Sequence, residues 1–232
     1  MPKDNVSVFD ILGPVMIGPS SSHTAGVARI AFLARRMFGA KPDRAIVRFY
    51  GSFSTTWKGH GSDKAAIAGL LGISPEDEAL SRGAALLAEA DARGEGFPIQ
   101  LVGEAGLHPS WHPNTVVFEL ESAGRTLKIR AASVGGGSIR IEEIDGYRVN
   151  LSGELDALLV HHHDEIGVIA IVSHILAANR INIAATSSHR KEKGDEAMLV
   201  VETDGAIPPS VLEQIQSLPP VYAVVRVPAL GI

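Results

Sequence analysis

Apolar residues recur at helical spacing in the first third of the chain. After residue 25 they fall three or four positions apart, which predicts an amphipathic helix that ends at Gly39. A second helix is predicted around 66–71, and a third is predicted to open with Ser74 as its cap and Pro75 at its first position. The apolar face of the first helix consists of Val27, Ile30, Ala31, Ala34, Met37 and Phe38, while Arg29, Arg35 and Arg36 fall outside it.

Segments rich in β-forming residues dominate the middle of the chain. They predict strands at 44–50, 98–102, 115–121, 126–134, 139–144 and 147–151. Ala123-Gly124 and Asp145-Gly146 have the composition of hairpin turns between them. Residues 1–152 therefore read as one α/β domain.

The pattern changes after Ser152-Gly153-Glu154, which looks like a linker. Strands at 157–161, 181–187, 196–203 and 222–227 alternate with a helix capped by Asp164 and a short helix at 208–217. This βαββαβ order is the ferredoxin-like arrangement, so we expect an α+β chain with domains at 1–152 and 153–232. The first helix of the second domain is apolar on more than one side, which favours burial against a neighbouring subunit as well as against the sheet.

Composition narrows the functional classes. Among 232 residues, 21 are Lys or Arg and 26 are Asp or Glu, a net charge of −5 that argues against a nucleic-acid partner. No apolar run has the length of a membrane span and residues 1–5 do not open a signal peptide, so we expect no membrane partner and a cytoplasmic location. The chain has no cysteine, hence no disulfide, thiol nucleophile or thiolate metal ligand.

One cluster of polar residues stands at the start of the first helix. Ser20, Ser21, Ser22, His23 and Thr24 follow Gly18-Pro19 and directly precede the helical pattern. Hydroxyls, an imidazole and free backbone N–H groups at a helix N-terminus favour a bound anion, either a carboxylate or a phosphate. The alternative is plain helix capping, for which Ser and Thr are preferred residues.

A second candidate is His60, which lies between Gly59 and Gly61 and follows Lys58. The flanking glycines remove the bulk that would keep a ligand away from the imidazole, although a surface turn that happens to contain His is the simpler reading.

Other histidines and glycines give weaker signals. His108 and His112 lie four apart, but the prolines between and beside them make helical metal-ligand spacing improbable. Three adjacent histidines at 161–163 point alternately on an extended chain and do not easily chelate one ion, so one or two of them more plausibly line a ligand groove. The triple glycine at 135–137 lacks the strand–loop–helix context of a dinucleotide site.

Four motifs taken together resemble those of the iron–sulfur L-serine dehydratases. They are Gly18-Pro19-Ser20-Ser21-Ser22-His23-Thr24, Lys58-Gly59-His60-Gly61-Ser62-Asp63-Lys64, His112-Pro113-Asn114-Thr115 and Ser133-Val134-Gly135-Gly136-Gly137. Residues 157–229 resemble an ACT domain with its Asp164-x-x-Gly167 turn. The combination is similar to the beta subunit of the two-chain form, whose N-terminal domain is similar to the allosteric substrate-binding domain of some phosphoglycerate dehydrogenases. The family often has Thr where this chain has Ser62, a change that keeps the hydroxyl.

The resemblance implies a reaction and a division of labour. A [4Fe–4S] cluster on a partner alpha chain would accept the departing hydroxide of L-serine, which agrees with the absence of cysteine here. His60 would take the α-proton as the catalytic base. Substrate binding would fall to Ser20, Ser21, Ser22, His23, Thr24, Lys58, Gly59, Gly61 and Asn114. An amino-acid effector, with serine as the first candidate, would bind near His163, Asp164, Gly167 and Asn182 between two self-associated ACT domains, and we expect no metal ligand in this chain.

Two other functions remain open. The chain could be a non-catalytic, amino-acid-binding regulatory subunit, although such a subunit would not need a base such as His60. A self-contained metal hydrolase built on His108, His112 and residues 161–163 would lack a recognisable metal motif.

Overall fold

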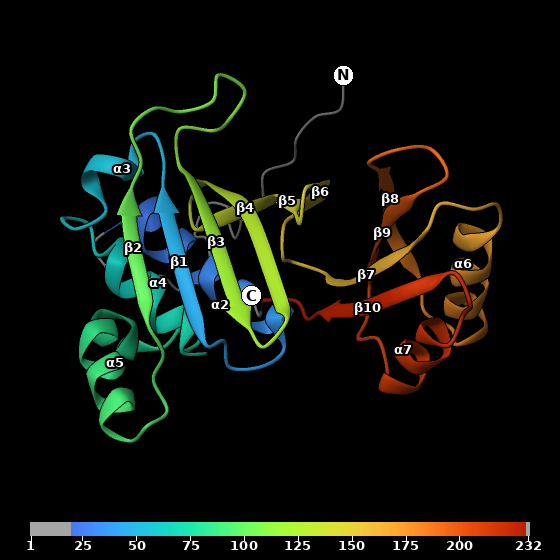
Figure 1. The fold of residues 1–232 in the computed structure, drawn as a ribbon, viewed down its shortest axis with the longest axis horizontal. Helices are drawn as coiled ribbons and strands as arrows, with labels where there is room; N and C mark the ends of the chain where they lie inside the picture. The colour runs from blue at the N-terminus through green and yellow to red at the C-terminus, as the bar shows by residue number, and fades with distance from the viewer. Residues whose placement is uncertain (1–19, 231–232) are drawn as a thin grey trace, which may run out of the picture.

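Six strands form the N-terminal sheet of the computed structural model, which describes residues 20–230 (Figure 1). Their spatial order is β2-β1-β3-β4-β5-β6. β2 runs parallel to β1, and every other neighbouring pair is antiparallel. The strands are β1 (Arg44–Phe49), β2 (Ile99–Gly103), β3 (Thr115–Ser122), β4 (Arg125–Gly135), β5 (Ser138–Ile144) and β6 (Tyr147–Leu151), which confirms the predicted strands of this domain.

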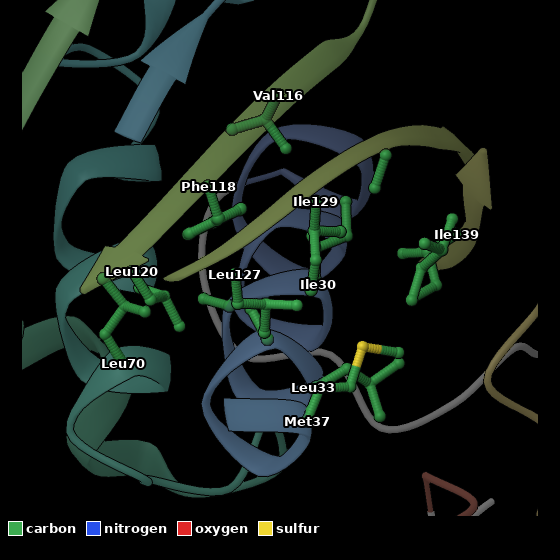
Figure 2. Close-up of a cluster of buried hydrophobic side chains, with 14 of the residues drawn as sticks. Ile30, Leu33, Met37, Leu70, Val116, Phe118, Leu120, Leu127, Ile129 and Ile139 are labelled. Carbon is green, nitrogen blue, oxygen red and sulfur yellow. The ribbon is translucent and has the colours of Figure 1, made fainter. Parts of the chain in front are cut away.

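Helices lie behind this sheet and beside its β2 edge in the view of Figure 1. They are the π-helix η1 (Ser21–Ala25), α2 (Gly26–Phe38), α3 (Phe53–Thr56), α4 (Ser62–Leu70), the 3-10 helix η2 (Glu78–Arg82) and α5 (Gly83–Ala92). The predicted apolar face of α2 is buried, and Figure 2 shows Ile30 and Met37 among the side chains of β3 and β4. Gly39 ends α2 with a φ of 73°.

Two details of these helices differ from the sequence-based expectation. Arg29 falls outside the apolar face of α2, yet it is 6% exposed. The cap predicted at Ser74 is wrong, because η2 begins after Asp77, whose carboxylate accepts a hydrogen bond from Ala79 N at 2.8 Å. Ser74 instead precedes a turn, and Asp77, three residues further along, is the actual cap.

The C-terminal domain has the predicted βαββαβ order. Its antiparallel sheet has the order β10-β7-β9-β8, and helices α6 and α7 cover one face. The bounds are β7 (Asp156–His163), α6 (Val168–Ala178), β8 (Ile183–Arg190), β9 (Glu196–Thr203), α7 (Pro209–Gln216) and β10 (Val221–Val227). This is the ferredoxin-like topology of the expected α+β chain.

Asp164 does not cap α6 as predicted. The helix begins after Gly167, which has a φ of 104° and interrupts the approach from Asp164. The Asp164 carboxylate instead accepts hydrogen bonds from Arg190 Nη1 at 3.0 Å and Gly194 N at 2.9 Å. These contacts hold the pKa of Asp164 below its usual range, with the backbone N–H of Gly194 as the larger cause.

The core of the N-terminal domain extends onto one face of the C-terminal sheet, and the C-terminal domain has a second core of its own. Side chains alternate along β7, so that Leu158 and Val160 pack against the helices of their own domain while Leu159 faces the N-terminal domain. The segment that looks like a linker is packed as well, because Leu230 N donates to Gly153 O at 2.8 Å. The division at residues 152 and 153 stays a prediction. No helix within residues 20–230 combines the length and the apolar character needed to cross a membrane.

Candidate functional site

The N-terminal end of η1 presents the polar cluster of residues 20–24. Ser20 is extended and caps the helix, since its Oγ accepts a hydrogen bond from His23 N at 3.1 Å. Ser20 therefore acts as a helix cap, which is the alternative interpretation of this cluster. His23 Nδ1 lies 3.0 Å from Ser22 Oγ and 3.4 Å from Ser20 Oγ, so two of the three serine hydroxyls orient this imidazole.

His60 lies on the turn between α3 and α4, where Gly61 adopts a φ of 73°. Its backbone N–H donates to Thr56 O at 3.1 Å, and its ring Nδ1 lies 3.2 Å from the same oxygen. A carbonyl oxygen only accepts, so this contact places the proton of neutral His60 on Nδ1 and leaves Nε2 as the basic nitrogen. The side chain is exposed, and the turn therefore presents a base to solvent.

The two imidazoles lie beside each other. Their ring centroids are 4.8 Å apart with a tilt of 37°, and Phe53 packs edge-on against His23 at 5.0 Å. Two reciprocal hydrogen bonds join the backbones that carry them. Thr24 Oγ1 donates to His60 O at 2.7 Å, and Ser62 Oγ donates to His23 O at 2.9 Å. Because Thr24 and Ser62 are buried, the spacing of the imidazoles is set from inside the protein.

Burial and charge make the two histidines unequal. Burial lowers the pKa of His23, and the neighbouring His60 lowers it further. Within residues 20–230 the buried Nε2 of His23 has no hydrogen-bond partner. A neutral imidazole with one unsatisfied nitrogen is suited to hydrogen bonding with a ligand, whereas the exposed His60 is suited to proton transfer.

Asn114 reaches the same end of the sheet from another direction. Its Nδ2 donates to Ser133 O at 3.3 Å, and its Oδ1 accepts a hydrogen bond from Ser52 Oγ. Ser133 packs so closely on η1 and α2 that a Cβ on Gly26 would lie 2.1 Å from Ser133 Oγ. Asn114 is therefore anchored by two serines, one of which packs against the start of α2, and its hydrogen bonds do not go to the imidazoles.

The remaining predicted site residues lie either on the turn that carries His60 or on η1. Gly59 and Gly61 flank His60 and belong to the same turn. Lys58 is exposed and its Nζ lies 5.0 Å from the centroid of the Trp57 ring, while Ser21 is half-buried on η1. Sequence reasoning did not assign roles to Ser62, Ser133 and Phe53. The first two lie in motifs quoted above and could have been selected for their hydroxyls, but Phe53 carries no comparable signal.

The other histidines have local partners. His108 Nδ1 lies 2.9 Å from Ser110 Oγ, and His112 Nδ1 accepts a hydrogen bond from Asn114 N at 3.1 Å. Across residues 20–230 no three His, Cys, Asp or Glu side chains gather in a group that could hold a metal ion. The metal-hydrolase reading therefore has no geometric support in this part of the chain.

The four residues predicted to bind an effector do not meet within one chain. His163, Asp164 and Gly167 lie at the end of the C-terminal sheet where β7 stops and β9 starts. Asn182 precedes β8 at the opposite end, where its Nδ2 donates to Asp204 Oδ2. The eight residues of β8 separate the two ends by roughly 25 Å at the usual rise per strand residue. A site containing all four requires two copies of the chain.

Comparison with known sequences assigns the chain to a family. The family described as "Serine dehydratase beta chain" matches residues 7–144, more than half of the chain. The chain belongs to the serine dehydratase beta-chain family. The ACT domain family matches residues 157–220 of this beta chain, which covers most of the C-terminal sheet and its helices.

Individual relatives extend the match over nearly the whole beta chain. It is 43% identical over 221 residues to the "Probable L-serine dehydratase, beta chain" of Bacillus subtilis, covering 95% of this chain and 97% of the relative. It is 31% identical over 211 residues to the "L-serine dehydratase, beta chain" of Peptoniphilus asaccharolyticus, covering 90% and 92%. A shorter match, 28% identical over 115 residues, joins 50% of this chain to 22% of a "D-3-phosphoglycerate dehydrogenase" from Bacillus subtilis.

Proposed function

We propose that this chain is the beta subunit of an L-serine dehydratase and contributes His60 as the base that removes the α-proton of serine. The observation that carries the proposal is the imidazole pair, in which Nδ1 of His60 is occupied by Thr56 O and Nε2 is left to accept a proton. The two relatives that match over most of their length are both named as beta chains of L-serine dehydratase.

His23 and the hydroxyls of η1 are proposed to hold the substrate carboxylate. The Nε2 of His23 can donate a hydrogen bond when the proton sits on that nitrogen, and Ser22 Oγ can then donate to Nδ1. The lowered pKa of His23 favours the neutral ring, so a second cation does not build up beside His60 when His60 takes the proton. Lys58, Gly59, Gly61 and Asn114 complete the proposed substrate-binding set around the pair.

The reaction balances without further reagents. His60 takes the α-proton and the β-hydroxyl departs as hydroxide, so that elimination releases one water in total. The resulting aminoacrylate tautomerises to an imine, and one water hydrolyses the imine to pyruvate and ammonia. With no cysteine in this chain, its residues do not fit as ligands of an iron–sulfur cluster, and we place the [4Fe–4S] cluster on the alpha subunit. When bound there, the cluster supplies the Lewis acid that hydroxide needs in order to leave.

The beta chain purified alone should contain no stoichiometric iron and should not turn over L-serine, because it has no thiolate ligand. Anaerobic co-expression with a cysteine-rich alpha chain should yield a brown complex that releases pyruvate. Iron analysis and a pyruvate assay on both preparations test this prediction. A brown and active preparation of the beta chain alone would overturn the two-chain proposal.

A regulatory role of the ACT domain is proposed alongside catalysis. Ile166, two residues before α6, is 104% exposed, and Ile169, in the first turn of α6, is 47% exposed. Such exposure of large apolar side chains is unfavourable in an isolated chain. We propose that two beta chains associate through this surface. L-Serine would then bind between them, near His163, Asp164 and Gly167 of one copy and Asn182 of the other.

Replacing Ile166 and Ile169 with Asp should shift the purified beta chain from dimer to monomer, because each dimer would then bury like charges at its contact. Light scattering during gel filtration measures the mass. Val134→Asp is the matched control, since Val134 is also an exposed apolar residue, at 40%, but lies in the N-terminal domain. Unchanged dimers in the double α6 variant would contradict association through this surface.

A further inference from the structure

A cavity of about 170 Å³ lies where the two domains meet. Residues of α2, β4, β5 and β6 line it from one side, and residues of β7, β9 and β10 line it from the other. A single water needs only ~10–15 Å³ of cavity volume, whereas pockets that bind drug-sized ligands measure ~300–1,000 Å³. The cavity therefore suits a molecule of about the size of one amino acid.

The cavity is apolar in its depth and charged at its mouth. Buried side chains form the floor, among them Met37, Leu127, Leu159 and Met198, and the first two are labelled in Figure 2. Arg125 and Asp145 also line the cavity but are exposed, so their charges lie at its rim.

Arg125 is held in place without an acidic partner. Its Nη2 donates to Met37 O at 3.3 Å, and its guanidinium carbon lies 5.1 Å from the centroid of the Phe38 ring. Within residues 20–230 no carboxylate lies within ion-pair distance of it. The guanidinium thus keeps donors for an anion, and a carboxylate can take two of them in parallel.

Asp145 is a second exposed charged residue in the lining and offers the opposite charge. Its Oδ1 accepts a hydrogen bond from Lys128 N at 2.7 Å, which fixes the carboxyl group at the hairpin turn. Its second oxygen has no partner within residues 20–230, so it can accept from an ammonium group.

Two polar side chains that line the cavity, those of Tyr147 and His161, already have hydrogen-bond partners. Tyr147 Oη donates to Glu196 Oε2 at 3.0 Å, and His161 Nε2 lies 3.2 Å from the same oxygen. These three residues join β6 to β7 and β9 and need no ligand. Among the residues that line the cavity, the groups left for a ligand are the Arg125 guanidinium, the Asp145 carboxylate and the Thr126 hydroxyl, above an apolar floor. Lys191, whose Nζ lies 4.3 Å from the centroid of the Tyr147 ring, adds a second positive charge near Asp145.

We propose that this interdomain cavity binds a free α-amino acid with a short aliphatic side chain. The α-carboxylate contacts Arg125, the α-ammonium contacts Asp145, and the side chain lies on the floor formed by Met37, Leu127, Leu159 and Met198. Because both domains contribute contacts, the bound amino acid fixes their relative position. This site is separate from the proposed effector site at Asp164 and from the His23–His60 pair, and its occupation does not depend on serine turnover.

Titration calorimetry on the purified full-length beta chain tests the proposal with L-valine and L-leucine as probes. Both should bind, while glycine, which lacks the aliphatic side chain, should bind at least about tenfold more weakly. Arg125→Gln should weaken L-valine binding by at least about tenfold through loss of a charged hydrogen bond, and Arg125→Lys should retain part of it. Arg93→Gln, at the residue that follows α5, is the matched control, because Arg93 is also an exposed arginine, and this variant should bind as the wild type does.

Filling the cavity gives an independent test that leaves the charges intact. Ala223→Phe places a ring in the cavity from β10, where Ala223 is exposed and tolerates a larger side chain without disturbing the core. L-Valine binding should disappear in this variant while its thermal unfolding stays cooperative. Absence of heat from both probes with the wild-type chain would overturn the proposal. So would binding that survives Arg125→Gln and Ala223→Phe but is lost in Asp164→Asn, because the amino acid would then occupy the ACT-domain site.

Discussion

His60→Gln in the complex of the beta and alpha subunits should lower kcat for L-serine by about a hundredfold or more. Glutamine keeps a polar group of similar size on the turn between α3 and α4, but it cannot accept the α-proton. The Michaelis constant should change far less, because His60 acts in the transition state rather than in binding.

His174→Gln is the matched control for this variant, since His174 is an exposed histidine on α6 outside the proposed site. It should leave kcat and the Michaelis constant unchanged. The regulatory alternative predicts instead that His60→Gln shifts only the half-saturation and the cooperativity. Near-normal turnover of the His60→Gln complex at saturating serine would decide for that alternative.

His23→Ala should mainly change the Michaelis constant, whereas His60→Gln should mainly change kcat. Its imidazole is proposed to hold the carboxylate, so the apparent Michaelis constant should rise more than kcat falls. The two imidazoles lie only 4.8 Å apart, yet the lowered pKa of His23 and the exposure of His60 give them different chemistry. Steady-state kinetics of both variants on the same complex separates the roles.

Local patterns in the sequence predicted most of the fold because helices and strands bury their side chains periodically. The apolar stripe on α2 is an example, and it is confirmed. Local patterns were less reliable where a residue finds a distant partner. Asp164 looked like a helix cap but bonds to Arg190 and Gly194, which lie 26 and 30 residues further along.

The sequence motifs pointed to residues of the candidate site but not to the contacts that bring these residues together. His23 and His60 were selected from their motifs, whereas nothing in either motif shows that the other lies beside it. The hydrogen bonds that join them, from Thr24 and from Ser62, span 36 and 39 residues. Phe53 could not be selected, because a buried aromatic residue beside an imidazole has the same sequence pattern as any core residue.

Gly51→Ala should lower the free energy of unfolding of the beta chain by roughly 2–5 kcal/mol. Gly51 has a φ of 56°, and a Cβ there would lie 2.2 Å from Pro113 O. That oxygen belongs to the backbone and accepts a hydrogen bond from Ser52 N at 2.8 Å, so it cannot rotate away as a flexible side chain could. The loop must move, and Asn114, the next residue, must move with it. Urea unfolding of the purified chain measures the loss.

Gly72→Ala separates the two causes of that loss. Gly72 also has a positive φ, 88°, but no atom lies within 4 Å of the position its Cβ would take. This control should lose only the conformational part, about 1–2 kcal/mol. Equal losses in the two variants would show that contact with Pro113 contributes nothing. In the complex, Gly51→Ala should in addition raise the Michaelis constant for serine, because the displaced loop carries Asn114 away from Ser133, whereas Gly72→Ala should leave it unchanged.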